Sequence, residues 1–238
     1  MTSIRIIPET GSTNADLAAA LRAGEPLSEG DWLVARRQIA GKGRQGREWH
    51  DGAGNFMGST IVTIQDRDPP PASLSFVAAL AVFEAASRDL PSEAQLELKW
   101  PNDVLLDGGK LSGILLEMVG TSVVVGIGVN LTQAPHLADR KTAALSDRGT
   151  APVLDQFAPR LAEAFATCLS EWRSHGLRQS LKRFLSSSIH HAGAQVRVHD
   201  NDGQALTGTF AGLDKTDGAL LLRLADGSER VIRAGDVS

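Results

Sequence analysis

Apolar residues alternate with polar ones over short stretches of this 238-residue chain, and Gly, Pro or Asn bounds most of these stretches. That pattern predicts β-strands rather than helices. The predicted strands cover residues 4–7, 31–39, 56–64, 96–99, 104–106, 112–119 and 123–129. The close spacing of the last four favours adjacent antiparallel strands.

Apolar residues three and four positions apart predict four helices between and after these strands. The first, at residues 12–24, begins with a capping-box pattern in which Asp16 follows Thr13, and it ends at Gly24. We therefore expect Thr13 to cap it. The others are predicted at residues 72–90, 153–172 and 177–185. The single cysteine, Cys168, lies on the apolar side of the third helix, where a buried structural thiol is expected.

The pattern changes at residues 186–193, after which short strands alternate with turns at residues 201–203, 217–218 and 226–227. This arrangement is typical of a small β-barrel or sandwich. We therefore predict two domains, at residues 1–188 and 189–238.

Net charge argues against binding through an overall electrostatic field. The charge is −4 and the isoelectric point is about 5.9, so nothing attracts the whole protein to nucleic acid or to an anionic membrane. The N-terminus lacks an apolar signal core, and no apolar run reaches the roughly 18 residues of a membrane span. We expect a cytoplasmic protein that binds neither nucleic acid nor membrane.

Local positive charge is concentrated in Gly-Lys-Gly-Arg-Gln-Gly-Arg-Glu-Trp at residues 41–49, which connects two predicted strands. Its cations Lys42, Arg44 and Arg47 follow Arg36 and Arg37. Glycines allow backbone N–H groups to approach a ligand closely, and the cations add charge-assisted donors. The segment is either a loop that an anionic ligand orders or a solvated turn between strands.

Three further motifs carry polar residues at strand ends. In Lys-Trp-Pro-Asn-Asp at 99–103, Asn102 could hold a phosphate or sugar oxygen and Asp103 could bind Mg²⁺, although such a pair also occurs in plain turns. In Gly-Lys-Leu-Ser-Gly at 109–113, Lys110 is either a ligand-binding or a surface cation. In Val-Gly-Ile-Gly-Val-Asn at 125–130, the glycines indicate close backbone approach or tight strand packing.

Two common nucleotide-binding motifs are absent from this sequence. Gly109-Lys110 lacks the upstream glycine of a Walker A loop and is followed by Leu111. A leucine, Leu131, occupies the position of the third glycine of a Rossmann fingerprint. Generic nucleotide-binding folds are therefore disfavoured.

Taken in order, Gly-Ser-Thr-Asn at 11–14, Gln38, the segment 41–49 and the three motifs above resemble the biotin protein ligases, in the short form without an N-terminal DNA-binding domain. The resemblance covers almost the whole chain. It implies an α+β fold in which a mixed-sheet catalytic domain with flanking helices, similar to class II synthetases, precedes a small SH3-like β-barrel.

The resemblance also implies an activity. These enzymes use ATP and Mg²⁺ to convert biotin into biotinyl-5′-AMP with release of pyrophosphate. They then transfer biotin to a lysine of a biotin carboxyl carrier protein, such as that of acetyl-CoA carboxylase.

The motif positions carry implied roles. The implied biotin-binding residues are Ser12, Thr13, Gln38, Gly41, Arg44, Lys110 and Gly113. The implied ATP-binding residues are Lys42, Arg44, Arg47, Trp49, Asn102 and Asn130, with Trp49 stacked on adenine. The implied catalytic residues are Lys110, Arg44 and Asp103, and Asp103 is also the candidate Mg²⁺ ligand. Lys42 stands where the family usually has arginine, which keeps the charge but loses the planar donor fork.

Three alternatives remain open. A lipoate or octanoate ligase or transferase shares the fold, although those families use a different glycine- and arginine-containing motif here. A DNA-binding repressor is disfavoured, since the catalytic pattern begins within the first dozen residues. A non-catalytic biotin- or nucleotide-binding protein would have the same residues. Exposed strands of the sheet could also pair in a homodimer.

Overall fold

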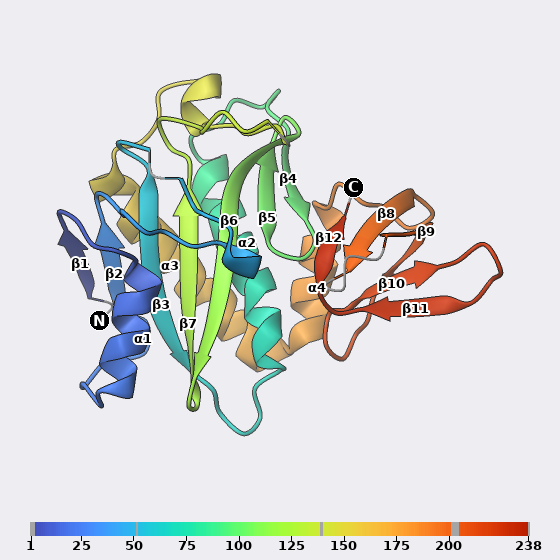
Figure 1. The fold of residues 1–238 in the computed structure, drawn as a ribbon, viewed down its shortest axis with the longest axis horizontal. Helices are drawn as coiled ribbons and strands as arrows, with labels where there is room; N and C mark the ends of the chain where they lie inside the picture. Colours follow the sequence, from blue (N-terminus) through green and yellow to red (C-terminus); the bar gives the residue numbers. More distant parts are fainter. Residues whose placement is uncertain (1–2, 51, 139, 201–204, 238) are drawn as a thin grey trace.

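The structure is a computed structural model that describes residues 3–50, 52–138, 140–200 and 205–237 (Figure 1). A seven-stranded sheet forms its larger part, in the order β1-β2-β3-β7-β6-β5-β4. Its strands are β1 (Ile4–Ile7), β2 (Trp32–Ala35), β3 (Phe56–Thr63), β4 (Leu96–Lys99), β5 (Asp103–Leu106), β6 (Gly109–Val119) and β7 (Ser122–Val129). The sheet is mixed because β1 and β2 are parallel, whereas the other neighbours are antiparallel.

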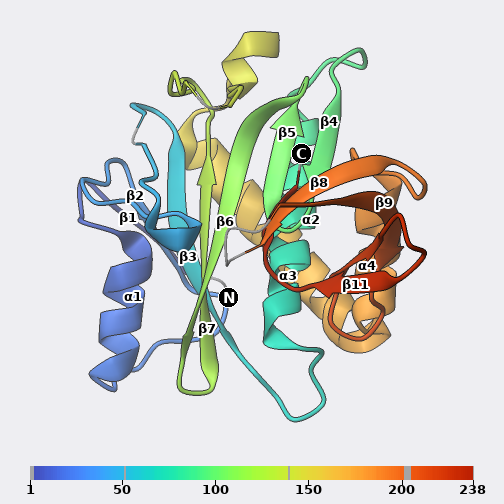
Figure 2. The ribbon, with the colours of Figure 1, turned by 45° about the vertical axis from the view of Figure 1, so that its right-hand side comes forward.

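A smaller antiparallel sheet follows, in the order β11-β10-β9-β8-β12. Figure 2 shows it beside β4, β5 and helix α2. Its strands are β8 (Gln195–Asp200), β9 (Ala205–Leu213), β10 (Leu220–Arg223), β11 (Glu229–Ile232) and β12 (Gly235–Val237). Trp100 Nε1 donates to the carbonyl of Gly218 at 3.0 Å, so a buried contact joins the two sheets. The α+β fold with a small C-terminal β-unit is thus confirmed.

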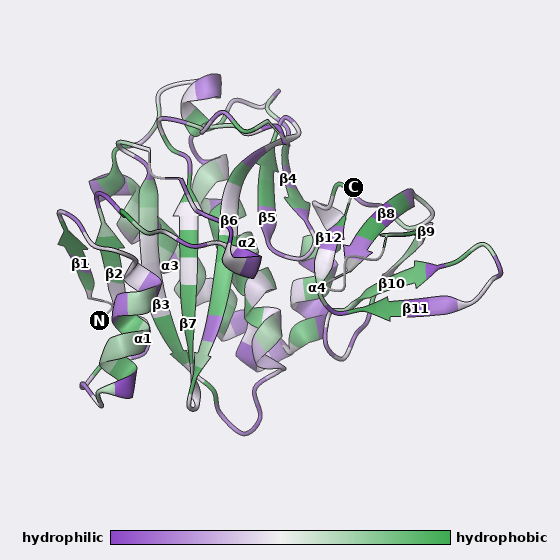
Figure 3. Cartoon of the chain, in the orientation of Figure 1, coloured by the Kyte–Doolittle hydropathy of each residue, from purple (hydrophilic) through white to green (hydrophobic). Residues whose placement is uncertain are grey.

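Helices cover both faces of the larger sheet, and the hydropathy colouring shows how apolar its strands are (Figure 3). Helix α1 (Thr13–Arg22) packs on one face, where Leu17 and Ala18 contact Ile61 and Val124. The other face is covered by α2 (Leu74–Ser87) and α3 (Leu154–His175), and α4 (Leu177–Ser186) packs against these two helices. Because α2 is apolar all round, it is buried between the sheet and the other two helices.

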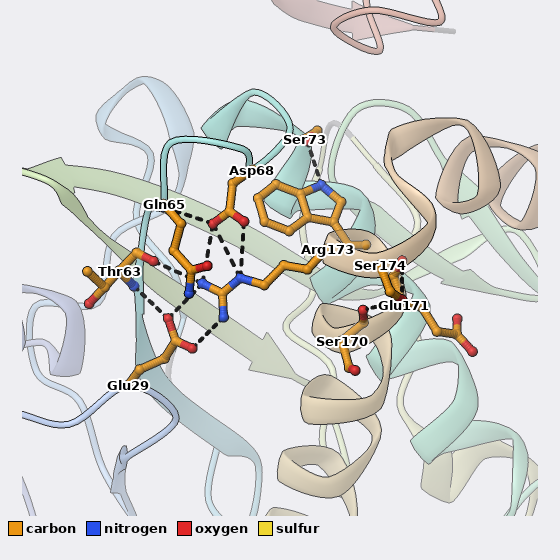
Figure 4. A network of polar contacts seen from close by, with 10 residues as sticks. Glu29, Thr63, Gln65, Asp68, Ser73, Ser170, Glu171, Arg173 and Ser174 are labelled. Atoms are coloured by element: carbon orange, nitrogen blue, oxygen red, sulfur yellow. Dashed lines mark hydrogen bonds and ion pairs between the residues drawn. The ribbon is translucent and has the colours of Figure 1, made fainter.

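An ion-pair network fixes the end of α3 to the loops below the sheet (Figure 4). The guanidinium of Arg173 donates to Glu29 at 2.6 Å and to Asp68 at 3.2 Å. The hydrogen bond from Arg173 lowers the pKa of Glu29, against the opposing effect of burial. The neighbouring Trp172 donates its Nε1 to Ser73 Oγ at 2.8 Å. These bonds set the position of α3 along the sheet.

Most elements predicted from the sequence are confirmed, with two corrections. The strand predicted at 31–39 ends at Ala35, because the chain then leaves the sheet toward the segment 41–49. The first helix is capped by Ser12, whose side chain accepts from the backbone N–H of Ala15, and not by Thr13. The predicted turn at 201–203 lies outside the described residues. Within the part of the chain that the structure describes, no helix is both long and apolar enough to cross a membrane.

Candidate active site

The segment 41–49, called the cationic loop below, lies within the connection between β2 and β3 and forms a compact turn. The backbone N–H of Gly43 donates to the carbonyl of Arg47 at 2.7 Å, and that of Trp49 donates to the carbonyl of Gly41 at 2.9 Å. Between them, Gln45 (φ 57°) and Gly46 (φ 72°) take left-handed conformations that reverse the chain. These bonds position the side chains of the loop over the sheet.

An inner cavity lies between the start of α1, the cationic loop and strands β3, β6 and β7. It encloses about 480 Å³, including its open mouth. Among the residues lining it are Ser12, Thr13, Asn14, Gln38, Lys42, Arg44, Trp49, Ser59, Lys110, Gly113, Gly126 and Gly128.

Four buried polar side chains form a connected row along this cavity. Gln38 Oε1 accepts from the backbone N–H of Thr13 at 2.7 Å and lies 3.0 Å from Thr13 Oγ1. Thr13 Oγ1 lies 2.7 Å from Ser59 Oγ, which in turn lies 2.7 Å from Asn14 Oδ1. Buried hydroxyls and amides arranged in a row suit a small polar ring better than an apolar one.

The indole of Trp49 packs against a part of the sheet that is formed by glycines and therefore has no side chains. Gly113 of β6 and Gly128 of β7 are directly paired in the sheet. A Cβ added at Gly128 would lie 2.3 Å from Cε2 of Trp49, and one added at Gly113 would lie 3.0 Å from its Cζ3. The indole Nε1 is buried and has no partner among the described residues. Only glycine at both positions therefore lets the indole lie this close to the sheet.

An outer cavity of about 920 Å³, open mouth included, adjoins the first. Its lining includes Arg44, Arg47, Trp49, Asn102, Asp103, Lys110, Asn130, Arg140 and Asp236. Lys110 Nζ donates to Asp103 Oδ1 at 2.7 Å, and both side chains are about one-fifth exposed. Asn130 is held in place by its own amide, which donates to the carbonyl of Ala143 at 3.1 Å.

The two cavities share one wall, made of Gly43, Arg44, Trp49, Asn102 and Lys110. Arg44 Nη1 donates to Asn102 Oδ1 at 2.8 Å, and Asn102 Nδ2 donates to the carbonyl of Ile114 at 2.7 Å. These bonds hold the guanidinium of Arg44 at the junction, and the ion pair with Asp103 holds the ammonium group of Lys110 there. Such a junction can bring two anionic groups together and stabilise the charge between them.

The C-terminal sheet contributes to the outer cavity through β12. Asp236 forms an ion pair with Arg47, and Arg44 Nη2 reaches the carbonyl of Gly235 at 3.4 Å. Burial raises the pKa of Asp236, but the hydrogen bond from Arg47 and the charges of Arg47 and Arg44 outweigh it, so the net shift is downward. Burial lowers the pKa of Arg44, as does the charge of Arg47, while Asp236 and Asp103 oppose this.

Sequence comparison identifies the family. The profile of the biotin/lipoate A/B protein ligase family matches residues 9–132, and the profile of the biotin protein ligase C-terminal domain matches residues 191–238. The chain belongs to the biotin protein ligase family.

Similar proteins in this family match over nearly the whole chain. The biotin–[acetyl-CoA-carboxylase] ligase of Paracoccus denitrificans is 38% identical over 98% of both chains. The ligase of the same description from Mycobacterium tuberculosis is 37% identical, over 98% of this chain and 87% of that one. Among solved structures, the biotin protein ligase of Aquifex aeolicus in complex with biotin and ATP superimposes with a TM-score of 0.83, at 25% identity, over 100% of this chain and 98% of that one.

Most residues singled out by resemblance to the biotin protein ligases lie around the two cavities. Of the implied biotin-binding set, all but Gly41 line the inner cavity. Gly41 instead accepts the backbone bond from Trp49. Of the implied ATP-binding set, all but Lys42 line the outer cavity, and Lys42 lines the inner one. Asp103 lines the outer cavity. Their roles stay predictions.

Several lining residues were not singled out from the sequence. Asn14 belongs to the motif at 11–14, but the resemblance assigns biotin binding only to its neighbours Ser12 and Thr13. Ser59 is a polar residue inside an apolar strand, which is a signal that could have identified it. Gly128 lies in the motif at 125–130, whose glycines indicate either close backbone approach or tight strand packing. Asp236 has no local signal, because its place in the outer cavity depends on how the two sheets pack.

Proposed function

We propose that this protein is an ATP-dependent biotin protein ligase, which activates biotin to biotinyl-5′-AMP and transfers it to a lysine of a carrier domain. The observation that carries the proposal is the wall of Arg44, Asn102 and Lys110 shared by the two cavities. A vitamin bound on one side and a nucleotide bound on the other would meet at this wall.

The inner cavity suits the ring of biotin, and the outer cavity suits ATP. Thr13, Ser12 and Gln38 offer buried hydrogen-bonding groups to the ring. Trp49 offers an aromatic face to adenine, and Arg47 with Asn130 faces the nucleotide. The solved relative in complex with biotin and ATP supports this division.

In the first step, a carboxylate oxygen of biotin attacks the α-phosphorus of ATP. A P–O bond forms to that oxygen, and the bond to pyrophosphate breaks, with its electron pair leaving on pyrophosphate. Both reactants are anionic, so cations at the junction lower the barrier. Lys110 and Arg44 supply these cations, and the bond from Arg44 to Asn102 fixes the guanidinium before reaction.

In the second step, the neutral amine of the carrier lysine attacks the acyl carbon of the adenylate. A C–N bond forms, the C–O bond to AMP breaks with its electron pair, and the amine loses a proton to the departing phosphate or to water. Water competes with the amine for the same carbon. The cationic loop excludes water by covering the adenylate.

Magnesium is part of the proposal, and the donor set of the outer cavity fits it. Mg²⁺ is usually held by one or two carboxylates together with substrate phosphates and waters. Asp103 lies in this cavity beside Lys110. The described residues contain no cluster of three His, Cys, Asp or Glu side chains able to hold a metal alone. Asp103 would therefore hold Mg²⁺ jointly with ATP, and the ion would neutralise phosphate charge.

The carrier domain of acetyl-CoA carboxylase or of a related carboxylase is the proposed partner, supported by the names of the two curated relatives. We also propose a homodimer through an exposed strand of the larger sheet, and the division into domains at residues 1–188 and 189–238.

Exchange of labelled pyrophosphate into ATP tests the proposed activity. We expect exchange that depends on biotin and Mg²⁺ and is absent with lipoate. Exchange driven equally by lipoate would assign the protein to the lipoate branch of the fold. Absence of exchange with either acid would leave a binding protein without this activity.

A further inference from the structure

The row of Gln38, Thr13, Ser59 and Asn14 has fewer protons than it has contacts. Gln38 Oε1, Thr13 Oγ1, Ser59 Oγ and Asn14 Oδ1 make three successive oxygen–oxygen contacts of 3.0, 2.7 and 2.7 Å. The two hydroxyls supply one proton each, and a carbonyl oxygen supplies none. One of the three contacts therefore has no proton.

A second imbalance lies at the end of the same row. The Asn14 side chain is 6% exposed, and its Nδ2 has no partner among the described residues. A buried N–H donor without a partner is destabilising, because it has lost its hydrogen bonds to water and gained none in return. The row thus has one proton too few for its three contacts, whereas the amide nitrogen of Asn14 at its end carries two protons that no partner accepts.

A half-turn of the Asn14 carboxamide corrects both imbalances. It puts Nδ2 at the position 2.7 Å from Ser59 Oγ, so that donation runs from Asn14 to Ser59, then to Thr13, then to Gln38 Oε1. Each hydroxyl then donates once and accepts once. The choice between amide nitrogen and oxygen is decided by such networks.

The half-turn also decides what the cavity offers a ligand. The Asn14 carbonyl oxygen takes the place where Nδ2 had no partner, and Asn14 is one of the residues that line the inner cavity. At the other end of the row, Gln38 Oε1 already accepts hydrogen bonds from Thr13. The group of Gln38 that can donate to a ligand is therefore Nε2. The lining therefore presents one acceptor and one donor, with their polarity set by Ser59.

We infer that Ser59 and Asn14 are specificity-determining residues, which orient this row so that it reads a ring with both an N–H donor and a C=O acceptor, as in a cyclic urea. The inference rests on the proposed function and adds to it the reason for choosing biotin. A dithiolane ring has neither group and would leave both ends of the row unpaired. Sites of this kind reject ligands that lack the matching polar groups.

Glycine at position 126 makes this arrangement sterically feasible. A Cβ there would lie 2.8 Å from Cγ of Asn14 whichever way the carboxamide is turned, so only glycine lets the carboxamide lie over β7. Ser59 is fully buried on the neighbouring strand β3, where Ser59 and Gly126 are paired. The sheet itself thus fixes the row.

Ser59→Ala tests the orienting role. We expect the KM for biotin in pyrophosphate exchange to rise about tenfold with kcat within about twofold, since the row loses its fixed direction but the cations at the junction stay in place. Ser75→Ala is the matched control, because Ser75 is also buried and donates one bond, to the carbonyl of Ala72 at 3.0 Å. An unchanged KM in Ser59→Ala, or an equal rise in the control, would overturn the inference.

Asn14→Asp tests whether this side chain faces the ring. The probe is 2-iminobiotin, in which a protonated imine replaces the ureido oxygen and adds positive charge. With an oxygen facing the ring, the variant keeps its acceptor and becomes anionic, so the affinity ratio of 2-iminobiotin to biotin should rise more than tenfold in calorimetric titration. Asn55→Asp, which buries a carboxylate outside the lining of the inner cavity, should leave the ratio unchanged.

A ratio that stays constant or falls in Asn14→Asp would show that this side chain does not face the ring and would refute the inference. Failure of the proposed function has a different signature, because wild-type protein would then show neither biotin binding nor biotin-dependent exchange. Wild-type protein that passes both tests while the variants behave like their controls removes the specificity role alone.

Discussion

At the scale of single residues, Lys110 lies at the junction of the two cavities. It lines both cavities, forms an ion pair with Asp103 at 2.7 Å and lies at the mouth of β6. With its side chain about one-fifth exposed, its charge is only partly screened by water. A partly desolvated ammonium group at a junction of two anions acts more strongly than the same group on the surface.

Lys110→Ala should slow biotinyl-adenylate formation about 100- to 1,000-fold, the usual effect of removing one preorganised group that stabilises transition-state charge. Single-turnover formation of the adenylate, followed by chromatography, measures it. Lys215→Ala is the control, since Lys215 is an exposed turn residue of the smaller sheet. Retention of the wild-type rate in Lys110→Ala would remove Lys110 from the mechanism.

At the scale of elements, the site depends on how β6, β7 and the cationic loop fit together. The sequence predicted the strands and the connection, because alternation and turn residues are local signals. The resemblance to the biotin protein ligases supplied the site residues, nearly all of which line the two cavities. The sequence missed the cap at Ser12, since Ser12 and Thr13 are both good caps and only the bond of Thr13 to Gln38 decides between them. It also missed Asp236, which reaches the site through packing of distant elements.

Gly128→Ala should displace the Trp49 indole, because the added methyl would lie 2.3 Å from it. We expect the KM for ATP to rise about tenfold or more, together with a shift in tryptophan emission. Gly11→Ala serves as control, since a methyl group there meets open space and the backbone is not in the left-handed region. A KM for ATP that matches wild type would show that Trp49 does not need glycine at this position.

Arg44→Gly should weaken the covering role of the cationic loop, because it removes the bonds to Asn102 and to the carbonyl of Gly235. Biotinyl-adenylate should then dissociate roughly tenfold faster or more, as followed by filtration of the preloaded enzyme. Arg36→Gly removes an exposed ion pair with Asp155 and is the matched control. Equal retention of the intermediate in the two variants would contradict a covering loop.

At the scale of the whole molecule, the junction between the two sheets carries a buried titratable group. His190 is 9% exposed, packs near Phe210 of β9 and has no partner for Nε2 among the described residues. Burial, with smaller effects from Lys99 and His191, lowers the pKa of His190 to about 4 from 6.5. The folded protein therefore holds this imidazole neutral where the unfolded chain would protonate it.

The sign of the pH effect follows from that difference. Above pH 6.5 this histidine is neutral in both the folded and the unfolded chain, so it does not reduce the free energy of unfolding. As the pH falls from 6.5 toward 4, only the unfolded chain binds the proton, and the free energy of unfolding decreases. At pH 5 the loss is about 2 kcal/mol, so His190→Leu should lose less stability than wild type between pH 7 and pH 5. Urea unfolding at the two pH values measures this, with His136→Leu at an exposed histidine as the control. Equal losses in both variants would refute it.

The ion pair between Arg47 and Asp236 joins two residues that lie 189 positions apart in the sequence. During synthesis the cationic loop leaves the ribosome early, whereas β12 leaves it nearly 190 positions later. Until then Arg47 lacks its carboxylate and Arg44 lacks the carbonyl of Gly235. A growing chain therefore cannot assemble this corner of the site, and maturation of the loop is tied to translation of residues 235–236.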